Sequence, residues 1–218
     1  MEIITHISTF SIIIAAVLGV IRFKQIEPSY YPFIYICWLG LVAEIIAFAY
    51  QAKSGSLLPS NIYVLLEGLF FVWQFKLWGS FQRRRWVYYL TLGAILALWI
   101  ADNLIVRTIH GLSSYYRIGY SFVLVILAID QINKLIVSER KSFLTNAKFL
   151  ICITIIIYFS YKLTTEIFYL EALGKESSSE FVGQIFSIQK YVNLFANLLY
   201  AYVILWIPRK KIFLEPLS

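Results

Sequence analysis

The chain is 218 residues long, and 60% of its residues are hydrophobic while only 14% are charged. So few polar residues cannot coat a water-soluble globule of this size, which excludes a soluble domain and predicts an integral membrane protein. The net charge of +7 does not indicate a nucleic-acid partner, because the basic residues flank apolar runs and membrane topology explains them better. Membrane lipids are the partners that this composition implies.

Seven apolar stretches follow one another along the chain, and each is long enough to cross a bilayer. A run of about 20 apolar residues, at 1.5 Å rise per residue, matches a hydrocarbon core roughly 30 Å thick. The predicted spans cover residues 3–21, 31–51, 61–78, 86–106, 116–137, 148–170 and 184–207. The loops between them are short, so we expect an all-α fold in which residues 1–218 form one transmembrane helical bundle without a soluble domain.

Basic residues are concentrated in alternate loops. One side of the predicted membrane carries Arg22, Lys24, Lys76, Arg83, Arg84, Arg85, Lys134, Arg140, Lys141, Lys148, Arg209, Lys210 and Lys211. The other side carries only Lys53, Arg107, Arg117 and Lys175. Because short loops rich in Lys and Arg stay in the cytoplasm, we expect the N-terminus outside and the C-terminus inside, as in a multi-pass protein of the bacterial cytoplasmic (inner) membrane.

A weak internal repeat relates the two halves of the chain. Glu44 precedes Glu67 by 23 positions. Glu166 precedes Lys190 by 24 positions, and each interval contains a polar loop with serine on the outer side. This spacing is consistent with a 3+1+3 arrangement, in which the first and last helix triplets are related as parallel repeats around an axis along the membrane normal. Chance is a serious rival explanation for a single aligned pair.

Ionisable residues within the predicted spans gather in the outer half of the membrane: Glu44, Glu67, Lys162, Glu166 and Lys190. A charge in the bilayer costs several kcal/mol unless it faces the interior of the bundle and finds a partner there. Such residues are therefore the best indication of a functional site in this sequence.

Helical spacing places these charges on polar stripes, because residues three or four apart share one face of a helix. We expect the stripes of the third, sixth and seventh spans to point inward and to line a cavity that opens outward. The ligand-binding candidates are Glu44, Tyr63, Glu67, Gln74, Tyr158, Lys162, Glu166, Lys190, Asn193 and Asn197.

A purely structural role for the same charges is an open alternative. In this alternative, two ion pairs only hold the bundle together, through interactions of about 1 kcal/mol each. Glu67 would pair with Lys190, and Glu166 with Lys162 one turn away on the same helix. Glu44 has no basic residue inside its own span, so a proton-handling role and a neutral, hydrogen-bonded glutamate both remain open.

Two further acidic residues are expected to be structural. Asp130 and Lys134 are four residues apart on the fifth span, which is the spacing of a helical ion pair. Asp102 is expected at the solvated end of its helix, where Arg107 lies close enough to compensate it.

The sequence does not indicate an enzyme. His6 and His110 lie on different segments, and there is no HExxH, Cys-rich or Asp-rich motif. A GxSxG elbow and a Gly-rich phosphate loop are also missing, and Cys37 and Cys152 lie inside predicted spans as packed core residues. We therefore assign no catalytic residue, no metal site and no cofactor. A lipid-modifying enzyme that uses Glu44 or Glu67 as a base stays open.

Three segments carry a resemblance to known proteins. They are AEIIAFAY around Glu44, NIYVLLEGLFF with Asn61, Tyr63 and Glu67, and VNLFANLLYAYVILW in the last span. In these segments, and loosely over most of its length, the chain resembles small uncharacterised bacterial seven-helix membrane proteins. The resemblance implies a fold and no activity.

These observations favour a receptor-like or sensory membrane protein. It would bind a small polar or amphipathic ligand in the outward-facing cavity and pass a shift of its helices to a cytoplasmic or membrane signalling partner. The alternative is a small-solute or ion transporter or channel that uses Glu44 and Glu67, although the last two spans lack the interior Gly or Pro breaks of a carrier. A second alternative is a structural subunit of a membrane complex, in which the polar stripes face a partner.

Overall fold

The computed structural model describes residues 8, 10–54, 56–106, 108–138, 145–174 and 179–210. In this part of the chain the α-helices are α2 (Ile12–Arg22), α3 (Tyr31–Ser54), α4 (Leu58–Leu77), α5 (Arg85–Ile100), α6 (Ser114–Ser138), α7 (Ala147–Gly174) and α8 (Ser179–Trp206). Two 3-10 turns, η1 (Phe23–Gln25) and η2 (Pro28–Tyr30), connect α2 to α3, and the π-helix η3 (Ala101–Val106) continues α5. The predicted all-α fold is confirmed.

The helices begin and end within a few residues of the predicted spans. The exception is the first span, since most of residues 3–11 lie outside the described part of the chain. The same holds for the predicted loop charges Arg107, Arg140, Lys141, Lys175 and Lys211, and for His6.

Four helical segments are long and apolar enough to cross a membrane: Pro28–Ala47, Arg85–Val106, Ser114–Val137 and Ala147–Leu170. These four segments indicate a membrane protein. The helices α4 and α8 are not among them, and both carry several of the polar residues that line the interior of the bundle.

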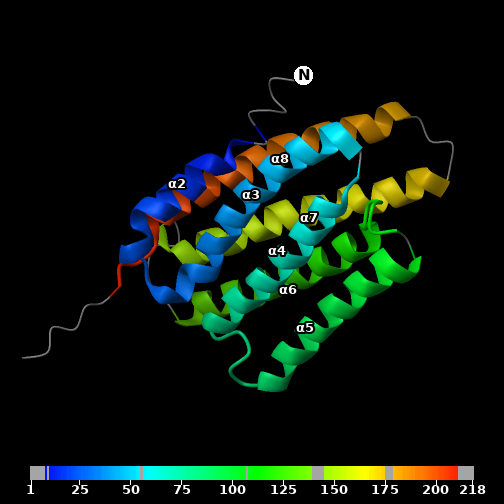
Figure 1. Ribbon diagram of the computed structural model, residues 1–218. Helices are drawn as coiled ribbons and strands as arrows, with labels where there is room; N and C mark the ends of the chain where they lie inside the picture. The colour runs from blue at the N-terminus through cyan, green and yellow to red at the C-terminus, as the bar shows by residue number, and fades with distance from the viewer. Residues whose placement is uncertain are drawn as a thin grey trace, which may run out of the picture.

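Six of the helices form a closed ring, and α5 lies outside it. Around the ring, α2 packs on α3, α3 on α4, α4 on α6, α6 on α7, α7 on α8, and α8 returns to α2. The helix α5 packs against α4 and α6 from outside (Figure 1). Side chains that point toward the centre of the ring can therefore meet although they come from distant parts of the sequence.

The loops identify the two ends of the bundle. At one end, the backbone N–H of Glu27 donates to the carbonyl of Pro208 over 3.0 Å, and Lys210 N–H donates to Gln25 O over 2.7 Å. At the opposite end, the N–H of Leu57 donates to the carbonyl of His110 over 3.1 Å. We call the end with Glu27 and Pro208 the basic end, because the turns at Arg22–Lys24, Arg83–Arg85 and Arg209–Lys210 all lie there. We call the opposite end, with Leu57 and His110, the polar end.

Apolar side chains fill the half of the bundle next to the basic end. Phe33 and Phe75 are fully buried there, and Phe71 packs edge-to-face on Phe159 with ring centroids 5.7 Å apart. Cys37 and Cys152 are buried free thiols in the same region, as expected of packed core residues. This half of the interior is a close-packed hydrocarbon core.

Candidate ligand-binding site

Two adjoining cavities lie inside the ring, in the half next to the polar end. The first has a volume of about 280 Å³ and touches α2, α3, α4, α7 and α8; we call it the α2 cavity. The second has a volume of about 240 Å³ and touches α3, α4, α6, α7 and α8; we call it the α6 cavity. Both are lined by Gly40, Glu44, Tyr63, Tyr158 and Gln189, which form their shared wall. Each cavity has room for a small polar molecule or a few waters.

The carboxylate of Glu67 is the most highly coordinated group of the site. Tyr63, one turn earlier on α4, donates its hydroxyl to Oε1 of Glu67 over 2.8 Å. Tyr120 of α6 donates its hydroxyl to Oε2 over 2.7 Å, and the ammonium group of Lys162 on α7 lies 3.4 Å from the same oxygen. Because these partners come from three helices, the carboxylate connects α4, α6 and α7.

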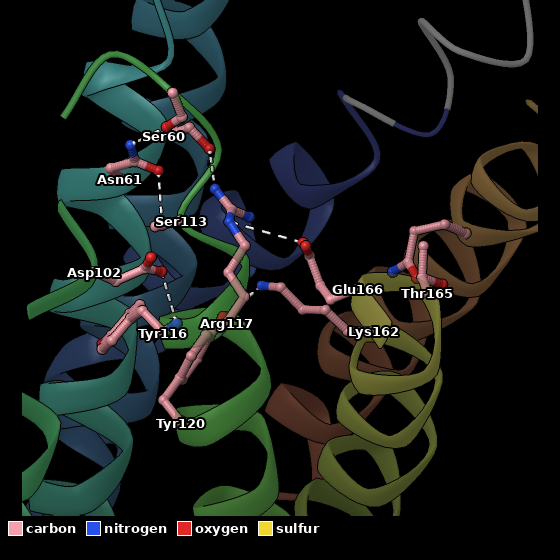
Figure 2. Close-up of polar contacts among 12 residues, drawn as sticks. Ser60, Asn61, Asp102, Ser113, Tyr116, Arg117, Tyr120, Lys162, Thr165 and Glu166 are labelled. Atoms are coloured by element: carbon pink, nitrogen blue, oxygen red, sulfur yellow. Dashed lines mark hydrogen bonds and ion pairs between the residues drawn. The ribbon is translucent and has the colours of Figure 1, made fainter. Parts of the chain in front are cut away.

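Lys162 occupies an aromatic cage at the centre of the ring. Its ammonium group also donates to the hydroxyl of Tyr120 (Figure 2). The same group lies 5.1 to 5.4 Å from the ring centroids of Tyr120, Tyr158 and Phe159. Cation–π attraction to the three rings and ionic attraction to the Glu67 carboxylate together compensate the loss of water around this buried charge.

Arg117 and Glu166 form a second, looser ion pair beside the α6 cavity. Nε of Arg117 lies 3.8 Å from Oε1 of Glu166, which is too long for a hydrogen bond, and Nη2 donates to the hydroxyl of Ser60 over 2.8 Å (Figure 2). Arg117 is 8% exposed and Glu166 is 5% exposed. In the described part of the chain, Nε of Arg117 and Oε2 of Glu166 are buried without a hydrogen-bond partner. This pair keeps unused hydrogen-bonding capacity at the cavity wall.

Glu44 lies on the wall shared by both cavities. Its side chain is half-buried, and it forms no hydrogen bond or ion pair with any residue that the structure describes. Its situation is thus unlike that of Glu67 and Glu166, whose carboxylates each lie close to a cation.

A line of hydrogen bonds holds α8 against the start of α2 at the α2 cavity. Asn197 donates to the hydroxyl of Ser11 over 2.8 Å, and Ser11 donates to the carbonyl of Ser8 over 2.7 Å. Ser8 in turn donates to the backbone carbonyl of Lys190 over 2.7 Å. Asn197 therefore combines a cavity-lining position with a structural bond, while Lys190 and Asn193 line the same cavity from α8.

A buried network orders the polar end above the site. Asn61 donates its side-chain amide to the carbonyls of Ile109 and Gly111 over 2.9 and 2.7 Å, and its side-chain oxygen accepts from Ser113. Asp102 accepts a hydrogen bond of 2.8 Å from the backbone N–H of Tyr116 in the first turn of α6, as an N-terminal helix cap does. The expectation of a solvated Asp102 is wrong, because this residue is 1% exposed.

Nine of the ten predicted binding residues line the two cavities. The α2 cavity contains Glu44, Tyr63, Glu67, Tyr158, Lys190, Asn193 and Asn197, and the α6 cavity contains Glu44, Tyr63, Tyr158, Lys162 and Glu166. Gln74 lies apart from them. Its side-chain oxygen accepts from the backbone N–H of Phe33 over 2.9 Å and its amide donates to Ser29, so it holds the start of α3 at the basic end. That these residues contact a ligand stays a prediction.

The ion pairs differ from those predicted. Glu67 pairs with Lys162, where the sequence suggested Lys190, and Glu166 pairs with Arg117, where the sequence suggested Lys162. The predicted pair of Asp130 and Lys134 is confirmed, with a separation of 2.5 Å.

Sequence reasoning missed several residues of the cavities and their network, among them Ser60, Arg117, Tyr120 and Gln189. Arg117 was counted among the loop charges because it lies close to a predicted helix boundary. A signal was present, since Arg117, Tyr120 and Leu124 recur at intervals of three and four residues and so share one face of α6.

No protein-family model, no curated protein and no solved structure matches this chain. The resemblance to small bacterial seven-helix membrane proteins therefore stays a prediction, and the site has to be interpreted from its own geometry.

Proposed function

We propose that this chain is a receptor-like membrane protein that binds a small ligand with a cationic group in the two cavities beneath its polar end. In this proposal all seven helices span the bilayer of a bacterial cytoplasmic membrane, with the N-terminus outside and the C-terminus inside. The four apolar spans and the closed ring of helices support a multi-pass bundle. The gathering of basic turns at one end supports the orientation, since such turns stay in the cytoplasm.

The observation that carries this proposal is the carboxylate of Glu44. The charges of Glu67 and Glu166 are compensated by Lys162 and Arg117, so those four groups require nothing further for neutrality. Glu44 has no such partner among the described residues, yet it belongs to the wall of both cavities. An unpaired carboxylate inside a membrane bundle is costly, and a bound cation would remove that cost.

The surroundings of Glu44 suit an ammonium-bearing molecule. The rings of Tyr63 and Tyr158 lie on the same shared wall and offer π-faces as well as hydroxyl groups. Asn193 and Gln189 add neutral amide groups that can accept or donate hydrogen bonds. Cavities of about 280 and 240 Å³ select for a ligand of amino-acid or small-amine size.

Ligand binding would act on the packing of the helices. A ligand shifts an equilibrium only by binding one arrangement more tightly than the other. The lining groups belong to α2, α3, α4, α6, α7 and α8, so closure around a ligand would change the contacts of the whole ring. The basic turns at the opposite end, around Arg83–Arg85 and Lys210, are then the surface that a signalling partner would read.

A transporter is the second candidate, and the repeat pattern favours it. The positions paired by the 3+1+3 spacing, Glu44 with Glu166 and Glu67 with Lys190, all line the cavities. The two triplets also form the two halves of the ring, with α5 outside. Against transport stands the packed core next to the basic end, which would have to open to create a path across the membrane.

A ligand screen by thermal unfolding in detergent tests the proposal. The probes are amino acids, betaines and small primary amines, each beside a neutral isostere. A true ligand at a hundred times its dissociation constant stabilises by about 2.7 kcal/mol, or about 5 to 10 °C in Tm for a chain of this size. We expect Glu44→Gln to abolish this shift. The matched control is Glu27→Gln at the basic end, where the carboxylate accepts a hydrogen bond from Ser29, and it should keep the full shift.

Two outcomes would contradict the proposal: no amine shifts Tm relative to its neutral isostere, or Glu44→Gln is protected as strongly as the parent. The first would favour the structural-subunit alternative. Uptake of the protecting compound into proteoliposomes would instead favour the transporter.

A further inference from the structure

An apolar groove runs between α4 and α5 on the outer surface of the ring. It has a volume of about 410 Å³ and is lined by Leu66, Leu69, Phe70 and Trp73 of α4 and by Tyr88, Leu92 and Leu96 of α5. The α5 residues recur every four positions, so they form one stripe that extends about 12 Å along the helix. The groove exists because α5 lies outside the ring, with only part of its surface in contact with α4 and α6 (Figure 1).

A basic pocket continues this groove at the basic end of the bundle. Its volume is about 330 Å³, and its lining consists of Lys76, Phe81, Gln82, Arg85, Tyr88 and Tyr89. Tyr88 lines both the pocket and the groove. The ammonium group of Lys76 lies 4.2 Å from the centre of the Tyr88 ring. Phe81 packs edge-to-face on the same tyrosine, with ring centroids 5.5 Å apart. The lining has two cations and no carboxylate.

We propose that α4 and α5 form a binding site for one anionic phospholipid, whose phosphate occupies the basic pocket and whose acyl chain lies in the apolar groove. The site is distinct from the two cavities, since no residue lines both.

Charge and position identify this occupant. The candidate membrane span of α5 begins at Arg85, which places the pocket where the hydrocarbon ends and the lipid headgroups begin. Lys76 and Arg85 supply positive charge to a phosphate, and the Gln82 amide supplies a neutral hydrogen-bond donor. The apolar groove leads directly from this point along α5. A free phosphate would use the pocket and leave the groove empty, whereas a phospholipid fits both parts.

Titration of single lipids followed by native mass spectrometry tests the site on the whole chain in detergent. The probes are phosphatidylglycerol and phosphatidylcholine with identical acyl chains. Each basic residue near an anionic headgroup raises the affinity about fivefold. The double variant Lys76→Gln with Arg85→Gln loses two such contributions, so it should bind phosphatidylglycerol about 30-fold more weakly. The matched control is Arg83→Gln with Arg84→Gln, which removes the same amount of charge from the loop between α4 and α5, outside the pocket lining.

We expect the parent to prefer phosphatidylglycerol over phosphatidylcholine at least tenfold, and the control pair to lose less than threefold. Leu92→Trp, which fills the groove, should weaken both lipids. Equal binding of the two lipids by the parent would overturn the proposal. So would equal losses in the two charge pairs, which would mean diffuse attraction to the basic surface. Competition by inorganic phosphate as strong as that by the lipid, or a dimer that Leu92→Trp dissociates, would assign the surface to another occupant.

Discussion

Removal of Lys162 should destabilise the bundle because it leaves the Glu67 carboxylate buried without its cation. The two side chains are 9% and 5% exposed, and their charged atoms are 3.4 Å apart. At an effective dielectric constant of about 20, the attraction at that distance is about 5 kcal/mol before desolvation is subtracted. Loss of one partner from a buried ion pair typically costs about 3 to 5 kcal/mol. We therefore expect Lys162→Met to cost about 3 kcal/mol at pH 7.5.

A double-mutant cycle measures the pair itself. Reversible unfolding in mixed micelles gives the free energy for the parent, Lys162→Met, Glu67→Gln and the double variant, and we expect a coupling of about 2 to 3 kcal/mol. The control cycle uses Asp130 and Lys134, an ion pair of 2.5 Å whose side chains are 47% and 44% exposed. Exposed pairs contribute about 0 to 1 kcal/mol. Equal coupling in the two cycles would refute the reasoning.

Three substitutions test the packing around the site. Gly68→Ala should destabilise by about 1 to 3 kcal/mol, because its new Cβ would lie 3.0 Å from the hydroxyl of Tyr116. Its control, Gly93→Ala, meets nothing within 4 Å and should be neutral or slightly stabilising. Equal melting temperatures of the two variants would contradict this prediction. Gln74→Leu should cost about 1 to 3 kcal/mol in unfolding free energy, because a buried backbone N–H of α3 loses its acceptor; an unchanged value would mean that another group replaces it. Asn61→Ala removes two hydrogen bonds to backbone carbonyls, so limited proteolysis at residues 108–113 should become faster than in the parent, and an unchanged rate would contradict its role.

The helices and their inward faces could be predicted from the sequence because both depend on local periodicity. An apolar run fixes the length of a span, and a spacing of three or four residues fixes which side chains share a face. The hydrogen bond from Tyr63 to Glu67, one turn apart, follows directly from such a stripe. The same reasoning brought Lys162 and Glu67 toward one interior although they are 95 positions apart.

The partners across the interior could not be predicted, because periodicity determines neither the order of helices around the ring nor their relative depth. Glu67 meets Lys162 because α4 and α7 both face α6, whose Tyr120 bonds to both charges. Gln74 shows the effect of depth. It was assigned to the inward stripe of α4, but it lies close to the basic end of that helix, where it accepts a hydrogen bond from the start of α3. Arg117 shows the effect of a boundary, since it is a buried residue of α6 that a sequence count assigns to a loop.

The three carboxylates of the site differ in whether the stability of the bundle accounts for their burial. Glu67 has two phenol donors and an ammonium group, and Glu166 has a guanidinium group, so burial of either can be understood as part of the bundle's own cohesion. Glu44 gains nothing comparable from the residues that the structure describes, and it belongs to the lining of both cavities. A glutamine there would keep the shape and avoid the cost of a charge. The proposal that a ligand enters the cavity, as against the alternative of a structural subunit, therefore rests on the carboxylate of Glu44.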